Sequence, residues 1–294
     1  MRISNNMLTR NFLLNLESSL SRIALLQNQM SSGKSITKPS DDPVGIQNAL
    51  RFKSSVAMVE QWQSNASEAL SYMNTADSVL GKLTSLLQRA EELGLQGAND
   101  TNSENERKAI VEEIEQIKEQ IRSLANTKVG NKHIFSGTAT DTAPIDGDYN
   151  FQGNTEAVLF DIGNNIQINV MVNGQELFFG PDENTDIFKN LDKLKTQLLN
   201  GDAAQISAAA KAVGQNVARV TAIRANLGAR VNRLEAVQSQ LESMYLNLKK
   251  NLSEIEDANM AKTITEFTNQ QNLYQAALAV GSRILQPSLI DFMK

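Results

Sequence analysis

The chain has 294 residues, a net charge of −5 and a pI of about 5.2; 5% of its residues are aromatic, it has no cysteine, and its single histidine is His133. This composition excludes disulfides and thiolate chemistry, and the scattered Lys and Arg residues argue against nucleic acid as a partner. No apolar run approaches the roughly 18 residues of a membrane span, so no membrane insertion is expected.

The N-terminal segment predicts a helix that ends near residue 32. Its apolar residues recur at helical spacing, at Leu13, Leu16, Leu20 and Ile23. No basic start and apolar core with a small-residue cleavage site precede them, so any export is expected to proceed without a cleaved signal peptide. Gly33, Pro39 and Pro43 then break the pattern, and Asp42 is expected to cap the next helix.

Two further helices are predicted before residue 130. The first follows Pro43 and carries a stripe from Ala49 to Leu80 that only Gln63 and Asp77 interrupt. The second begins after Ser103, where Glu106 completes a capping-box pattern, and Gly130 is expected to end it.

The middle of the chain, residues 131–186, has a different pattern. Apolar residues alternate from Val158 to Ile162 and again from Ile166 to Val172, and each run is followed by Gly and Asn residues. Alternation of period two with such turns predicts strands. We therefore expect two adjacent hairpins, the second of them turning at Asn173-Gly174.

The C-terminal third carries the strongest periodicity. After a stop and cap at residues 200–202, apolar residues recur at alternating spacings of four and three from Ile206 to Ile255, and only Arg224 and Gln238 break the stripe. The stripe skips one residue and resumes from Met260 to Leu285, which indicates a joint between two helices.

These patterns predict a mainly α fold. We expect an elongated antiparallel helical bundle or coiled coil with a small β insert and partly disordered terminal helices. The expected segments are an N-terminal assembly helix and linker (1–42), the two halves of the bundle (43–130 and 187–255), a β-rich insert between them (131–186) and a C-terminal assembly helix (256–294).

Residues that could carry chemistry are few. Asp146, Asp148 and Asn150 have the spacing of a calcium loop, but Phe151 stands where that loop needs glycine, so a solvated turn is favoured. His133 has no catalytic partner nearby in the sequence, and no known catalytic or phosphate-binding motif is present. We therefore predict a protein that is not an enzyme and that has no cofactor and no metal site.

The two terminal stripes are the better functional candidates. A terminal helix outside the main bundle has few partners within its own chain, and a helix of about 25 residues is marginal alone. We therefore expect these helices to fold against copies of themselves in an assembly, through Leu13, Leu16, Leu20, Ile23, Met260, Ile264, Phe267, Tyr274, Leu278 and Leu285.

Several segments resemble the flagellin family. They are SSGKSITKPSDDPVGIQNALRFKSSV (31–56), NASEALSYMNTADSVL (65–80), LLQRAEELGLQGAND (86–100), ANLGARVNRLE (225–235) and ALAVGSRILQPSLIDFMK (277–294). The opening MRIS, the proline at position 43 and the ending SLIDFMK resemble the hook–filament junction branch of the family more than its filament subunits.

The resemblance implies a structural protein of the extracellular bacterial flagellum. It implies type III export, a chaperone that binds the C-terminal region, and terminal helices that pair in the inner tube. It also implies self-association in a junction ring, with another hook-associated protein on the hook side and the flagellin filament on the other. A filament flagellin is the alternative within the family, and a coiled-coil signalling protein is the alternative outside it.

Overall fold

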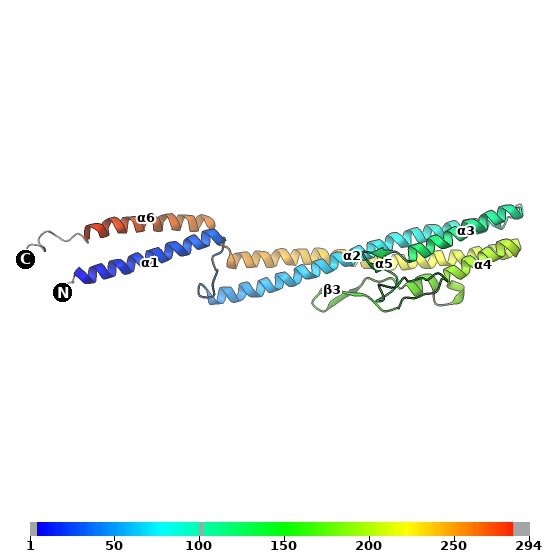
Figure 1. Cartoon of the computed structure of the whole chain (residues 1–294), viewed down its shortest axis with the longest axis horizontal. Coiled ribbons are helices and arrows are strands. Elements are labelled where there is room, and N and C mark those ends of the chain that lie inside the picture. Colours follow the sequence, from blue (N-terminus) through cyan, green and yellow to red (C-terminus); the bar gives the residue numbers. More distant parts are fainter. Residues whose placement is uncertain (1–4, 100–102, 285–294) are drawn as a thin grey trace, which may run out of the picture. The chain divides into compact units, whose positions relative to one another are not determined.

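The computed structural model of the chain describes residues 5–99 and 103–284. The fold is mainly α, with a small β insert (Figure 1). The chain forms two compact units: Met1–Met58 with Met244–Lys294, which we call the terminal unit, and Val59–Ser243, which we call the bundle unit. Two long helices, α2 (Pro43–Gly97) and α5 (Ala203–Glu256), contribute residues to both units.

The terminal unit is built around α1 (Asn5–Ser32) and α6 (Met260–Ile284), which pack against each other (Figure 1). Gly33, whose φ of 70° suits glycine, ends α1. Asn259 caps α6, because its side-chain oxygen accepts the N–H of Lys262 at 3.1 Å. The expectation that the terminal helices have few partners within their own chain is therefore wrong, since each is the partner of the other.

In the bundle unit, α2 and α5 run antiparallel. The stripe expected on α5 is confirmed as its buried face, which contains Ile206, Ala210, Val213, Val220, Leu227, Leu234 and Leu241. The helix stop and the cap that the sequence predicts before α5 are also present. Helix α4 ends at Asn200, and the Asp202 side chain accepts the N–H of Gln205 at 2.8 Å as an N-cap.

The charged interruptions of the two stripes face each other. Arg224 of α5 donates to both carboxylate oxygens of Asp77 of α2, from Nε at 2.8 Å and from Nη2 at 3.0 Å. If the two helices keep this register, Gln63 is expected opposite Gln238, because each lies two heptads from a member of the ion pair. A shift by one heptad would oppose Asp77 to Val217 or Val231 and would break its ion pair with Arg224.

Helices α3 (Glu104–Ala125) and α4 (Ile187–Asn200) pack against each other in the bundle unit. The capping box of Ser103 and Glu106 is present as predicted. The predicted end of α3 at Gly130 is wrong: the helix ends at Ala125, and Gly130 lies in the following turn with φ 61°.

The β insert holds two small antiparallel hairpins. One pairs β1 (Lys128–Val129) with β2 (Lys132–His133), and the other pairs β3 (Leu159–Gly163) with β4 (Ile166–Asn169). The β3–β4 hairpin is the first of the two that the alternation predicts.

The second predicted hairpin, turning at Asn173-Gly174, is wrong. A π-helical turn, η1 (Gln175–Phe179), stands there, and a 3-10 turn, η2 (Glu183–Thr185), leads on to α4. The side-chain oxygen of Asn173 accepts the N–H groups of Gln175 at 3.0 Å and of Glu176 at 3.4 Å, so the asparagine caps a helical turn.

Tyr149 anchors a loop of the insert to α3. Its backbone has a positive φ of 62°, which is unfavourable for a tyrosine. The ring lies 4.0 Å from Lys118 Nζ and packs on Phe188, while the hydroxyl donates to Glu119. Burial, followed by the bond to Glu119, raises the pKa of Tyr149 to about 12. These contacts hold the strained residue in place.

Candidate assembly surface

The contact between α1 and α6 uses one side of each helix. The less exposed residues recur at spacings of four and three: Phe12, Leu16, Ser19, Ile23, Leu26 and Met30 on α1, and Thr263, Phe267, Gln270, Tyr274, Ala277 and Gly281 on α6. Gln270 Nε2 donates to Ser19 Oγ at 2.8 Å, and the ring of Phe12 occupies the space that a side chain at position 281 would need. Small and polar residues therefore let the two helices approach closely.

A pair of backbone bonds joins the segment after α1 to the segment before α6. Ser35 N–H donates to the carbonyl of Glu256 at 2.7 Å, and Ala258 N–H donates to the carbonyl of Gly33 at 2.8 Å. These bonds form an antiparallel bridge between Lys34 and Asp257. The bridge closes one end of the helical pair, so α1 and α6 begin their contact in a fixed register.

Glu256 is the electrostatic centre of this bridge. Its side chain is 6% exposed, and its Oε1 lies 2.7 Å from the Nζ atoms of both Lys34 and Lys53. Burial opposes its ionisation, but the hydrogen bonds and charges of the two lysines outweigh burial and lower the pKa of Glu256. The bond to Glu256 in turn raises the pKa of Lys34. Two cations on one buried carboxylate tie the segment after α1 and the start of α2 to the end of α5.

The linker between α1 and α2 is ordered by two aspartates. The Asp41 carboxylate accepts the N–H groups of Lys38 at 2.9 Å and Thr37 at 3.1 Å, and these bonds lower the pKa of Asp41. Asp42 accepts the N–H of Val44 at 3.1 Å, which confirms its predicted capping role before Pro43. The linker between α1 and α2 is therefore an ordered turn held by side-chain to backbone hydrogen bonds.

The predicted assembly residues fall into two groups. Leu16, Ile23, Phe267 and Tyr274 are half-buried on the α1–α6 contact. A second group remains exposed, with 39–55% of each residue accessible: Leu13, Leu20, Met260, Ile264 and Leu278. Leu285 lies outside the described residues.

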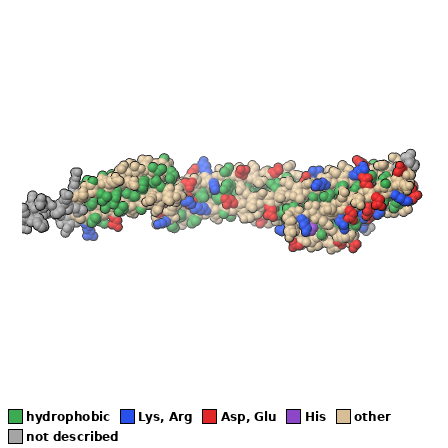
Figure 2. Space-filling model, turned by 45° about the horizontal axis from the view of Figure 1, so that its top comes forward, with side chains coloured by type: hydrophobic (Ala, Val, Ile, Leu, Met, Phe, Trp, Pro, Cys, Tyr) green, Lys and Arg blue, Asp and Glu red, His purple; other side chains and the backbone are tan. Residues whose placement is uncertain are grey.

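Further exposed apolar residues lie on other faces of the same two helices. Met7, Leu14, Leu25, Leu273 and Val280 are also more than 45% exposed. Figure 2 shows green side chains gathered over this part of the molecule. Single exposed leucines are ordinary, but this many on one helical pair mark a surface for another protein. The exposed apolar residues of this helical pair are therefore candidates for packing against another chain.

Hydrophobic periodicity alone missed part of this contact. Ser19, Gln270, Ala277 and Gly281 lie on the α1–α6 face, yet of these four only Gly281 falls on the predicted stripe, which follows spacing and not side-chain size. The close spacing of Ala277 and Gly281 on one helical face was the available sign of a tight helix–helix approach.

The side chains considered for chemistry have structural contacts. Asp146 Oδ1 accepts the N–H groups of Asp148 at 2.9 Å and Asn150 at 2.8 Å, so its carboxylate organises a turn. His133 is buried in β2. Across the described residues, no group of three or more His, Cys, Asp and Glu side chains is arranged to hold a metal. None of the described helices is both long and apolar enough to cross a membrane.

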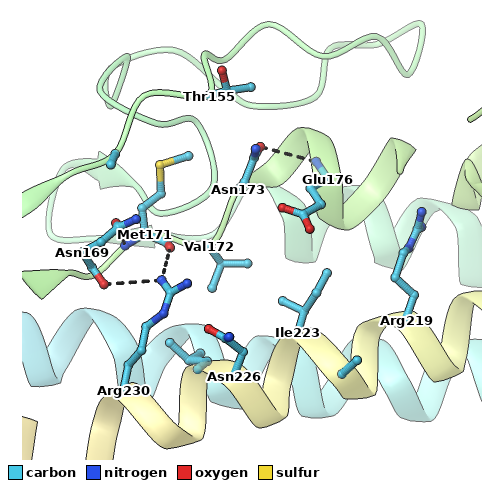
Figure 3. Close-up of a pocket in the computed structure, with 13 residues that line it drawn as sticks. Thr155, Asn169, Met171, Val172, Asn173, Glu176, Arg219, Ile223, Asn226 and Arg230 are labelled. Atoms are coloured by element: carbon cyan, nitrogen blue, oxygen red, sulfur yellow. Dashed lines mark hydrogen bonds between the residues drawn. The ribbon is translucent and has the colours of Figure 1, made fainter. Parts of the chain in front are cut away.

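A groove of about 510 Å³ separates the insert from α5 in the bundle unit (Figure 3). Arg230 Nη1 crosses it to the carbonyl oxygens of Met171 at 3.2 Å and Asn169 at 3.5 Å. Arg219 Nη2 donates to the carbonyl of Leu177 at 3.2 Å. Two arginines on one face of α5 therefore fasten the insert by its backbone.

Two family models match this architecture. The bacterial flagellin N-terminal helical region matches residues 3–140, and the bacterial flagellin C-terminal helical region matches residues 210–293. The chain belongs to the flagellin family. The two matches flank the larger part of the β insert and include both terminal helices, whereas α4 and the first turns of α5 lie between them.

Relatives and solved structures extend the comparison. The chain is 26% identical to flagellar hook-associated protein 3 of Escherichia coli K12 over 317 residues, which cover all of both chains. It is 29% identical to the flagellin of Bacillus subtilis 168 over 295 residues, which cover 95% of each.

Two solved structures have the same fold. Bacillus cereus FlgL has a TM-score of 0.60 at 24% identity and covers 69% of this chain and 99% of its own. The flagellar junction protein FlgL of Legionella pneumophila has a TM-score of 0.58 at 15% identity and covers 72% of this chain and 100% of its own. At these identities the two structures establish the fold alone.

Proposed function

We propose that this protein is a structural subunit of the bacterial flagellum that forms the junction between hook and filament. The observation that carries the proposal is the α1–α6 pair, which keeps apolar residues such as Leu13, Ile264 and Leu278 exposed after one face has been buried. Such a surface is stabilised when copies pack side by side. The end-to-end similarity to a hook-associated protein supports placing that assembly at the junction.

The proposed partners follow from this position. Copies of the chain associate in a ring through α1 and α6. Another hook-associated protein binds on the hook side, and flagellin polymerises on the other side. An export chaperone binds the C-terminal region before assembly, and the protein functions outside the cell. The exposed apolar residues of α6 support the chaperone step, because they need cover until copies meet.

Filament flagellin is the second candidate function. The similarity to the Bacillus subtilis flagellin over 95% of both chains favours it, since the identity is as high as that to the hook-associated protein. Both roles use the same helical pair, so the fold does not separate them.

The number of copies on each flagellum separates the two roles. Flagella sheared from cells are dissolved, and this chain is quantified against the major filament protein by mass spectrometry with labelled peptides. A junction protein is present in trace amounts that stay constant per flagellum as filaments lengthen. An amount that grows in proportion to filament length identifies a filament subunit instead and rejects the junction role.

A further inference from the structure

His133, the single histidine of the chain, lies where the β insert meets α2. It is 6% exposed and pairs with Lys128 across the β1–β2 hairpin. Beside it is a small cavity of about 60 Å³, whose wall comes from the insert on one side and from Tyr72 and Ala76 of α2 on the other. The imidazole therefore stands at a contact between two parts of the bundle unit.

The surroundings of His133 suit a neutral ring. Its Nδ1 atom is buried and has no hydrogen-bond partner within residues 5–99 and 103–284. The ionisable groups that line the cavity or pair with the histidine are Lys132, Lys128 and Tyr72, while the lining residues from β3, β4 and their flanking segments carry no charge. Among the described residues, no carboxylate lines this cavity to accept the proton of an imidazolium.

We propose that His133 is an acid-sensitive latch, whose protonation releases the β insert from α2. An imidazolium at this place would put a charge, and an N–H without an acceptor, into an apolar contact that already has two lysines nearby. The contact can relieve that cost by opening to water on the α2 side. The hydrogen bond from Arg230 of α5 to the carbonyl of Met171 is a separate contact, which keeps the insert attached to α5.

The direction of the pH effect follows from the histidine's surroundings. Burial, assisted by the charge of Lys128 and opposed by a hydrogen bond to the Asn126 backbone, lowers the pKa of His133 below its ordinary value of 6.5. The docked state thus binds fewer protons than the open one. The contact between the β insert and α2 is therefore most stable above pH 6.5, and it loses stability as pH falls from 6.5 through the lower pKa that His133 has in the docked state.

Two probes make this proposal testable without labels. The chain has one histidine, so one imidazole Cε1–H resonance reports the titration of His133 directly. It also has one tryptophan, Trp62 of α2, which lines a shallow pocket with Asp161, Asn164 and Asn165 of the β3–β4 hairpin. Trp62 fluorescence therefore reports whether this hairpin remains docked.

The experiment is an acid titration of the full-length monomer by NMR and by fluorescence. We expect His133 to titrate below pH 6.5 and Trp62 emission to change with the same midpoint, while the far-ultraviolet circular dichroism of the helices stays constant. In the His133→Gln variant, which cannot gain the charge, the fluorescence step should be absent. The same step in this variant, or a histidine that titrates at 6.5 without any change in emission, would overturn the proposal.

A second variant covers the case in which His133→Gln fails to fold. Lys128 is exposed, so Lys128→Glu is compatible with folding, and it replaces a cation opposite His133 by a carboxylate. The midpoints of both signals should then move together to higher pH. If the histidine midpoint moves and the tryptophan midpoint does not, protonation of His133 does not control docking of the insert.

Discussion

The same substitution at two leucines, one in each unit, should have different effects on stability and assembly. Leu234 of α5 is 0% exposed in the bundle unit, whereas Leu278 of α6 is 44% exposed in the terminal unit. Both are leucines within long helices, so Leu234→Asp and Leu278→Asp change helix propensity equally. The expected difference between the two variants therefore comes from burial.

The magnitudes follow from these exposures. Truncating a buried leucine alone costs about 2–5 kcal/mol, and an unpaired carboxylate at the same place adds its own desolvation, so Leu234→Asp should cost at least about 3 kcal/mol. With a urea slope of about 1–3 kcal/mol/M, the unfolding midpoint should fall by about 1 M or more. A substitution at a position as exposed as Leu278 should change the stability of the monomer by less than about 0.5 kcal/mol.

The assay combines unfolding with assembly. Urea unfolding is followed by Trp62 fluorescence for the bundle unit and by circular dichroism for all helices, and each variant is then expressed in cells that lack the wild-type protein. Leu278→Asp should fold normally but should not enter flagella, because a charge on the exposed surface prevents its burial between copies. If Leu278→Asp assembles normally, or destabilises the monomer as much as Leu234→Asp, the proposed assembly surface is refuted.

Three further predictions concern single contacts. Asp77 and Arg224 are both partly exposed, so a double-mutant cycle to alanine should give a small favourable coupling, and a value of zero would show that the bidentate pair contributes nothing to the seam. Because the contacts with Lys34 and Lys53 lower the pKa of Glu256, its carboxylate stabilises the terminal unit above pH 4.5, its usual pKa, and this stabilisation is lost as pH falls through the lower pKa of the folded state. Hydrogen exchange in α1 and α6 should therefore become faster in acid, and Glu256→Gln should abolish this pH dependence. Tyr149→Phe removes the hydroxyl that donates to Glu119 and should cost about 1 kcal/mol in thermal unfolding, whereas an unchanged melting temperature would show that this bond does not anchor the loop.

Much of the helical fold was predictable because its signals are local. The capping box at Ser103, the stop after Asn200 and the proline at position 43 each fix a helix end with side chains next to it in sequence. The seven-residue repeat of α5 is equally local, and the structure confirms its buried face. Such signals need no knowledge of what lies across the bundle.

The insert was harder to predict because tertiary packing decides it. Asn173-Gly174 is a strong hairpin signal, but η1 buries Leu177 and Phe178, and the ring of Phe178 packs on Phe135 from earlier in the insert and on Phe188 of α4. Burial of these side chains favours the helical turn over the local preference for a hairpin. The sequence also showed no sign of the buried environment of His133.

The sequence identified the two helices of the proposed assembly surface, but not which of their residues pack within the chain and which stay exposed. A stripe of period 3.5 does not say which of its residues meet the partner helix and which meet another chain. Leu16 lies on the contact within the chain and Leu13 does not, although both fit the same repeat. The role of either residue in assembly stays a prediction.

Deletion of the gene for this chain tests whether it forms the junction between hook and filament. Cells of the deletion strain are imaged by electron microscopy, and the culture medium is blotted for flagellin. A junction protein begins its role only after export, so we expect complete hooks without filaments, non-motile cells and flagellin monomer accumulating in the medium. Filaments of ordinary length on the deletion strain would rule out the junction role.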